Sequence, residues 1–121
     1  MAKKILIIDD EVDVSRMIAI RLKAKGYEVS SASTGKAGID LADELKPDLL
    51  LLDYRLPDML SSKIAGEIRG KDGLQRIPII LITATSEYIE ERAKECLASD
   101  YMMKPIEPEA LYVKVEKQIG V

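Results

Sequence analysis

Five polar side chains lie at the ends of short apolar runs in this 121-residue chain. They are Asp9, Asp10, Asp53, Thr83 and Lys104. Three carboxylates, one hydroxyl and one ammonium can together bind a divalent cation and a phosphate, because oxygen ligands suit the cation while the hydroxyl and the ammonium suit the anion. This chemistry requires a fold that brings the ends of the apolar runs to one place.

The apolar runs alternate with amphipathic segments five times along the chain. We expect strands at residues 5–8, 28–32, 49–52, 79–82 and 101–103. The second strand is the most polar and is expected near an edge of its sheet. Between the strands, apolar residues such as Val14, Ile18 and Leu22 recur at the spacing of a helix, and the third helix is expected near residues 62–69.

Capping residues indicate where several helices begin and end. Ser33 or Thr34 is expected to cap the second helix and Ser86 the fourth, because short hydroxyl side chains accept hydrogen bonds from the first free N–H groups. Pro108 suits the first turn of the last helix. Gly26 is expected to end the first helix.

The predicted fold class is α/β. Continuous apolar strands separated by helices indicate a parallel sheet with helices on both faces. Right-handed crossovers favour a doubly wound, flavodoxin-like sheet of five strands in the order 2-1-3-4-5. We expect one domain over residues 1–121 and no output domain in this chain. The functional crevice of such a sheet lies between the first and third strands, whose ends carry Asp9, Asp10 and Asp53.

Composition excludes several classes of function. The chain has no histidine, which rules out histidine catalysis, and its net charge of −3 without a basic run argues against direct binding of nucleic acid. A single cysteine allows no internal disulfide and indicates a reducing compartment. The sequence contains no apolar stretch long enough to span a membrane. We therefore expect a cytoplasmic protein.

The clustered carboxylates predict a metal site. Two carboxylates about 4 Å apart repel each other by about 4 kcal/mol at an effective dielectric constant of about 20. Lys104 neutralises part of this charge, and a divalent cation is expected to neutralise the rest. An all-oxygen ligand set favours Mg²⁺ or Mn²⁺ over zinc. An aspartate after a strand is also a common helix N-cap, and this interpretation stays open for Asp9 or Asp10 taken singly.

Four segments together resemble the signature of response-regulator receiver domains of two-component signalling. They are Ile7-Ile8-Asp9-Asp10-Glu11, Leu52-Asp53-Tyr54-Arg55-Leu56-Pro57, Ile82-Thr83-Ala84 and Tyr101-Met102-Met103-Lys104-Pro105. Each segment alone is a weak signal, but their order and spacing along the whole chain are specific. The resemblance implies a phosphoprotein of a two-component system or phosphorelay, either a stand-alone receiver or one cut from a longer regulator.

The resemblance also implies the chemistry of the site. Asp53 would attack the phosphohistidine of a sensor histidine kinase, or of a phosphotransfer protein, and become an aspartyl phosphate. Asp10, Asp53 and the backbone carbonyl of Arg55 would bind Mg²⁺ directly, and Asp9 would bind it through water. The domain would catalyse its own phosphorylation and dephosphorylation without turning over a separate substrate.

The switch residues follow from the same resemblance. The Thr83 hydroxyl, the Ala84 N–H and Lys104 would bind the phosphate. Thr83 would move inward, and Tyr101 would rotate into the vacated space and remodel the surface of the fourth helix, fifth strand and fifth helix for a downstream effector. Tyr101 as an ordinary strand aromatic is the alternative. The resemblance also implies that the Lys104–Pro105 peptide bond is cis. A trans turn proline is the alternative.

This chain departs from the common receiver pattern at three places. Leu60-Ser61 stand where many receivers have Asp-Gly, so we expect the loop into the third helix to differ. Leu97 replaces the glycine that usually follows the fourth helix, so a left-handed cap is not expected there. Arg55 and Thr85 occupy the positions that tune hydrolysis in the family. Neither is a carboxylate or amide that would hold an attacking water, so we expect slow self-dephosphorylation, with Arg55 shielding the phosphate.

The partners that the resemblance implies are proteins. Ile20 lies outside the inward stripe of the first helix and is a candidate for docking on the kinase, although scattered exposed apolar residues are normal. We expect a monomer or a phosphorylation-dependent dimer, with no nucleic acid or membrane partner. One alternative is a receiver-like interaction module that works without phosphate. Another is a small α/β hydrolase or nucleotide-binding protein, which would want a glycine-rich loop where Asp9-Asp10-Glu11-Val12 stands.

Overall fold

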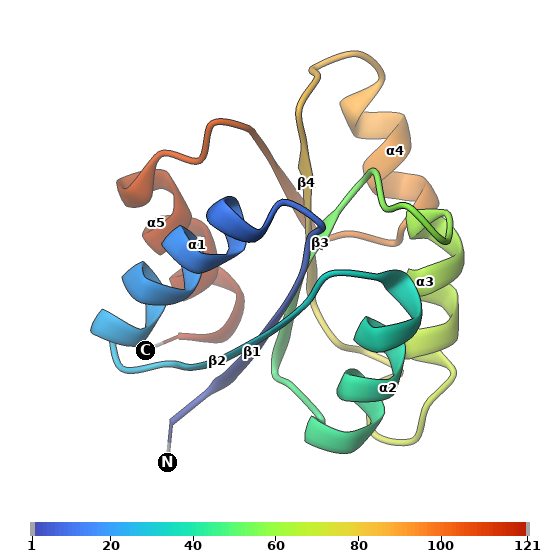
Figure 1. The fold of residues 1–121 in the computed structure, drawn as a ribbon, viewed down its shortest axis with the longest axis horizontal. Coiled ribbons are helices and arrows are strands. Elements are labelled where there is room, and N and C mark those ends of the chain that lie inside the picture. Colours follow the sequence, from blue (N-terminus) through green and yellow to red (C-terminus); the bar gives the residue numbers. More distant parts are fainter. Residues whose placement is uncertain (1, 121) are drawn as a thin grey trace.

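The computed structural model describes residues 2–120, and within them five strands alternate with five helices (Figure 1). The strands are β1 (Lys4–Ile8), β2 (Glu28–Ala32), β3 (Leu49–Asp53), β4 (Ile79–Thr83) and β5 (Asp100–Met103). The helices are α1 (Val12–Ala24), α2 (Gly35–Leu45), α3 (Ser61–Arg69), α4 (Ile89–Glu95) and α5 (Pro108–Ile119). Every predicted strand and helix is present.

All neighbouring strands are parallel, and the sheet has the order β2-β1-β3-β4-β5. The predicted doubly wound α/β fold is therefore confirmed, and the polar strand β2 lies at an edge. The order reverses between β1 and β3, where Ile8 pairs with Leu52. This register places Asp9 and Asp53 next to each other where the two strands end.

The sheet is covered on both faces, with α1 and α5 on one side and α2, α3 and α4 on the other (Figure 1). Alternate residues of each strand point to opposite faces, so Leu6 and Leu50 pack toward α2 and α3 while Ile7 and Leu51 pack toward α1 and α5. The four leucines of β3 are completely buried. Burial on both faces explains why the central strands are continuously apolar rather than alternating.

The caps of two helices agree with the sequence and one does not. The Thr34 hydroxyl accepts a hydrogen bond from Ala37 N–H at 3.1 Å, and Pro108 is in the first turn of α5. The predicted Ser86 cap of α4 is wrong, because the residue that precedes this helix is Tyr88, in a left-handed conformation. The Thr85 hydroxyl instead accepts a hydrogen bond from Glu87 N–H at 3.1 Å. A turn therefore continues beyond Ser86 before α4 starts.

The end of α4 also differs from the prediction. Leu97 adopts the left-handed conformation, with φ of +54°, although it has a side chain that disfavours it. Leu97 N–H donates to Lys94 O at 3.1 Å and Ala98 N–H donates to Ala93 O at 2.8 Å. The Arg69 guanidinium also donates to Leu97 O at 2.8 Å. These three hydrogen bonds hold a conformation that glycine would adopt more easily.

No helix in residues 2–120 is both long enough and apolar enough to cross a lipid bilayer.

Candidate functional site

The carboxylate cluster lies where β1 and β3 end side by side. Asp9 and Asp53 are buried, with 1% and 5% of their surface exposed, whereas Asp10 is exposed. One carboxylate oxygen from each of the three residues lies within 4.8 Å of the others. Repulsion at such separations amounts to about 4 kcal/mol per pair at an effective dielectric constant of about 20. The fold thus concentrates negative charge at one partly buried point.

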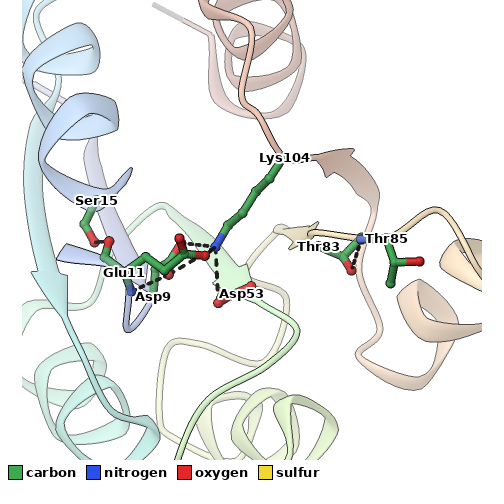
Figure 2. A network of polar contacts seen from close by, with 7 residues as sticks. All are labelled: Asp9, Glu11, Ser15, Asp53, Thr83, Thr85 and Lys104. Atoms are coloured by element: carbon green, nitrogen blue, oxygen red, sulfur yellow. Dashed lines mark hydrogen bonds and ion pairs between the residues drawn. The ribbon is translucent and has the colours of Figure 1, made fainter. Parts of the chain in front are cut away.

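Lys104 brings a positive charge to the same point from the end of β5. Its backbone N–H donates to Thr83 O at 2.8 Å, and the following Lys104–Pro105 peptide bond is cis, as the resemblance implied. The Lys104 Nζ atom lies 3.1 Å from Asp9 Oδ2 and 3.5 Å from Asp53 Oδ2. Figure 2 shows the lysine side chain extending between the strand ends to reach these oxygens.

Electrostatics at Asp53 favour the entry of a proton or a cation. Burial, together with the neighbouring charge of Asp9, raises the pKa of Asp53 to about 7, and the opposing charge of Lys104 lowers it only in part. Burial also acts to lower the pKa of Lys104, but its carboxylate partners outweigh this and the pKa is raised. The ammonium therefore stays charged while the carboxylates remain in excess.

The cluster fits a hard divalent cation. The buried Asp9 Oδ2 accepts no hydrogen bond from any group in residues 2–120, although Lys104 lies within ion-pair distance. All three side chains offer oxygen atoms, which Mg²⁺ and Mn²⁺ prefer. A carboxylate oxygen without a hydrogen-bond donor, in a site with excess negative charge, is suited to bind such an ion.

Thr83 and its neighbours occupy the next strand end. Thr83 is buried at the end of β4, and its hydroxyl accepts a hydrogen bond from Thr85 N–H at 3.3 Å (Figure 2). Ala84, between them, is exposed. This hydrogen bond links Thr83 and Thr85 to each other.

Tyr101 is on the same face of the sheet as Thr83. The register pairs Tyr101 with Leu81, and residues two apart on a strand point to the same face. Tyr101 is half-buried and packs against the core of the α2–α3–α4 face. The Lys114 ammonium lies 5.9 Å from the centre of its ring.

Arg55 and Ile20 are both exposed at the surface. Arg55 is exposed in the loop after β3 and forms an isolated antiparallel bridge with Leu60. Leu60 precedes α3, which begins one residue earlier than predicted. Ile20 lies on α1 with 62% of its surface exposed, in a surface groove that also includes Met17 and Tyr112.

Sequence reasoning missed two carboxylates that the structure places at or near the site. Glu11 Oε1 lies 2.5 Å from Lys104 Nζ; its position two residues after Asp9 was an available signal. Asp58, in the β3–α3 loop, accepts hydrogen bonds from the N–H groups of Gly35 at 2.8 Å and Lys36 at 3.0 Å. These bonds lower the pKa of Asp58 and tie the loop after Asp53 to the start of α2.

A doubly wound sheet with a buried aspartate after β1, another at the end of β3 and a lysine after β5 is the arrangement that the resemblance to receiver domains implies. The sequence matches the response regulator receiver domain over residues 5–116, and the chain belongs to this family. The resemblance inferred from the sequence motifs is thereby confirmed. Phosphorylation and Mg²⁺ are typical of these domains of two-component systems.

Relatives and solved structures agree with this assignment. The chain is 31% identical over 120 residues to the DNA-binding response regulator MtrA of Mycobacterium tuberculosis, covering 98% of this chain and 51% of MtrA. It therefore spans about half the length of the curated relatives it matches. The chemotaxis protein CheY4 of Vibrio cholerae superimposes with a TM-score of 0.91 at 25% identity, covering 98% of this chain and 100% of CheY4.

A third neighbour was solved with a ligand. The response regulator protein TrrA of Thermotoga maritima, in complex with Mg²⁺-BeF, superimposes with a TM-score of 0.85 at 31% identity. The match covers 97% of this chain and 99% of TrrA.

Proposed function

We propose that this domain is a phospho-accepting switch in which Asp53 takes a phosphoryl group from a sensor histidine kinase or a phosphotransfer protein. The observation that supports the proposal is the meeting of buried Asp53 with Asp9, Asp10 and Lys104 at the point where strand order reverses. The Mg²⁺-BeF complex of TrrA supports the same kind of site in a relative.

The reaction is a transfer between two nucleophiles. An Asp53 carboxylate oxygen attacks the phosphorus atom, the bond from phosphorus to the donor histidine nitrogen breaks, and its electron pair returns to the imidazole. Asp53 must be ionised for this step, and the positive charge of Lys104 favours that state. Asp10, Asp53 and the Arg55 backbone carbonyl would hold Mg²⁺, with Asp9 bound through water. When bound, the cation would neutralise charge on the phosphoryl oxygens.

Residues in and directly after β4 and β5 hold and sense the product. The Thr83 hydroxyl and the Ala84 N–H bind phosphoryl oxygens together with Lys104. Thr83 gives up its bond to Thr85 and moves inward, and Tyr101 rotates into the space. The shared sheet face of Thr83 and Tyr101 supports this coupling. The altered surface of α4, β5 and α5 then controls a downstream effector.

Two further roles complete the proposal. Arg55 and Thr85 set the lifetime of the aspartyl phosphate, and Ile20 docks on the helical bundle of the kinase. The exposure of Arg55 and Ile20 supports both roles, because each must meet water or a partner. Phosphorylation acts on the domain as a monomer or drives it to dimerise.

The proposal is tested by incubating the domain with Mg²⁺ and acetyl phosphate and measuring its intact mass. An adduct of about 80 Da that forms only with Mg²⁺ and is lost in Asp53→Asn is the expected result for a covalent phospho-aspartate. Asp72→Asn, a change in an exposed loop residue, is the control and should still be phosphorylated. The absence of an adduct in the wild type, with a folded domain, would favour a phosphate-independent interaction module.

A further inference from the structure

The closest charged partner of Lys104 is a carboxylate that belongs to neither the proposed metal ligands nor the proposed phosphate ligands. The Lys104 Nζ atom lies 2.5 Å from Glu11 Oε1, compared with 3.1 Å from Asp9 Oδ2 and 3.5 Å from Asp53 Oδ2. Figure 2 shows the three carboxylates grouped around the end of the lysine side chain. In the unphosphorylated domain the ammonium is thus nearer to Glu11 than to the phosphoacceptor.

The backbone of Glu11 is held in place by its neighbours. Its N–H donates to Asp9 Oδ1 at 2.9 Å. Its carbonyl accepts from Ser15 N–H at 3.1 Å and from the Ser15 hydroxyl at 3.3 Å. Glu11 is the N-cap residue of α1, but its side chain makes no capping hydrogen bond to the helix. The carboxylate is therefore available to Lys104.

The three carboxylate side chains differ in how easily they can separate from Lys104. Those of Asp9 and Asp53 are almost fully buried, whereas 56% of the Glu11 side chain is exposed. Water readily solvates an exposed carboxylate when its ion pair breaks, so breaking the pair costs little free energy. Glu11 is consequently the partner that Lys104 exchanges most easily.

A phosphoryl group on Asp53 competes for the same ammonium. An ammonium has three N–H donors, and in this structure its nitrogen is hydrogen-bonded to Glu11 and Asp9 and lies within ion-pair distance of Asp53. Binding a phosphoryl oxygen requires Lys104 to redirect a donor toward the new anion. Breaking the contact with Glu11 costs the least free energy, because Glu11 alone of the three partners can turn into solvent.

We infer that Glu11 is a positioning residue that holds the Lys104 ammonium in the unphosphorylated domain and releases it when the phosphoryl group arrives. The inference rests on the proposed function of Asp53 and Lys104. It assigns Glu11 the effect of weakening phosphoryl binding, because part of the favourable contact between Lys104 and the phosphoryl group replaces an existing contact with Glu11.

The expected size of the effect follows from the exposure of Glu11. Ion pairs that involve an exposed partner contribute little to stability. Loss of the competing pair should therefore tighten the binding of a phosphoryl analogue about two- to fivefold, which equals about 0.4–1 kcal/mol at 1.4 kcal/mol per factor of ten.

The test measures the affinity for beryllofluoride at saturating Mg²⁺ in four proteins. Glu11→Gln removes the charge, and Glu11→Asp keeps the charge but shortens the side chain by one methylene so that it falls short of Lys104. Asp13→Asn removes a charge from an exposed residue nearby in α1. We expect two- to fivefold tighter binding in both Glu11 variants, and wild-type affinity in Asp13→Asn. Thermal unfolding checks that all four proteins are folded.

The outcomes separate the inference from simple charge effects. If Glu11→Gln and Asp13→Asn both bind more tightly while Glu11→Asp matches the wild type, bulk charge explains the result and the inference is wrong. Wild-type affinity in both Glu11 variants also overturns it. If the wild type itself shows no Mg²⁺-dependent beryllofluoride binding, the proposed function fails and the inference fails with it.

Two measurements distinguish an ion-pair effect from a structural one. The advantage of Glu11→Gln should shrink as the KCl concentration rises from about 0.05 M to about 1 M, because salt screens an exposed ion pair. In the domain without metal or beryllofluoride, the NMR signals of the Lys104 ε-methylene group should shift in both Glu11 variants and stay unchanged in Asp13→Asn. Unshifted Lys104 signals in the Glu11 variants would contradict the inference.

Discussion

The Arg92 guanidinium of α4 stacks on the ring of Tyr54, the residue after Asp53, with its Cζ atom 4.3 Å from the ring centre. Arg92 Nη1 is buried and has no hydrogen-bond partner among residues 2–120. The face of the ring thus provides a favourable contact for a guanidinium that is not fully hydrogen-bonded. The contact joins the loop after the proposed phosphoacceptor to α4 by a route that bypasses Thr83 and Tyr101.

Replacing both members of this pair should reveal their coupling. In a double-mutant cycle of Tyr54→Leu and Arg92→Met, we expect a coupling free energy of about 1 kcal/mol, because cation–π pairs that are partly desolvated contribute about 0.5–2 kcal/mol. Urea denaturation of the four proteins measures it. Additive effects of the two substitutions would show that the stacking contributes nothing to stability.

Leu97→Gly should stabilise the protein. The left-handed conformation of Leu97 is unfavourable for a residue with a Cβ atom by about 1–2 kcal/mol, and glycine avoids this at an unfolded-state entropy cost of about 0.5–1 kcal/mol. The expected net gain in the free energy of unfolding is about 0.5–1 kcal/mol. Leu97→Ala, which keeps the Cβ atom, is the control and should show no gain. Equal stability of the glycine and alanine variants would refute the strain argument.

The raised pKa of Asp53 predicts how the metal-free domain responds to pH. A carboxyl group whose pKa is higher in the folded than in the unfolded state contributes stability while it is protonated. This contribution is present at low pH and is lost as the pH rises toward about 7. In EDTA, the wild type should therefore lose stability over this range relative to Asp53→Asn, as followed by urea denaturation. Parallel pH profiles of the two proteins would contradict the raised pKa.

Mg²⁺ binding should depend on the same proton. Because a metal ligand must be deprotonated, a pKa of about 7 at Asp53 predicts about tenfold weaker Mg²⁺ binding at pH 6 than at pH 8. Calorimetric titration at the two pH values measures the ratio. An affinity that is constant between them would show that Asp53 is already ionised at pH 6.

Arg55→Ala should shorten the life of the phosphorylated state. Arg55 and Thr85 supply no carboxylate or amide to hold an attacking water, and removing the exposed Arg55 side chain opens the site further. We expect slow dephosphorylation in the wild type and a several-fold faster decay in Arg55→Ala, measured by loss of the phosphorylated mass. Arg76→Ala, at another exposed arginine, is the control. A wild-type lifetime of seconds that Arg55→Ala leaves unchanged would rule out the shielding role.

Ile20→Asp should slow phosphotransfer from a kinase but not from acetyl phosphate. A charge placed in the exposed groove beside Met17 and Tyr112 must be desolvated when a protein docks there, whereas a small donor needs no docking surface. We expect at least a fivefold lower rate of kinase transfer, since desolvating a charge costs more than about 1 kcal/mol. The docking role is wrong if the kinase transfers to both proteins at the same rate.

The architecture could be predicted because its signals are local and repeated. Central strands buried on both faces must be continuously apolar, as in Leu49 to Leu52, and parallel strands separated by helices place all their carboxyl ends at one edge. The same rule predicts that Asp9, Asp53 and Lys104 meet at this edge. Propensity failed at Leu97, where three hydrogen bonds outweigh the preference for glycine, and at Ser86, where a Thr85 turn delays the helix.

Contacts between distant residues were not predictable in this way. The pairing of Glu11 with Lys104, the capping of α2 by Asp58 and the stacking of Arg92 on Tyr54 join residues separated by tens of positions. No periodicity records such pairs, because each depends on where two loops or helices meet after the core has packed. The sequence pattern therefore predicts which groups reach the crevice. The packing of the folded chain determines which of them are in contact, and so which carboxylate lies nearest to Lys104.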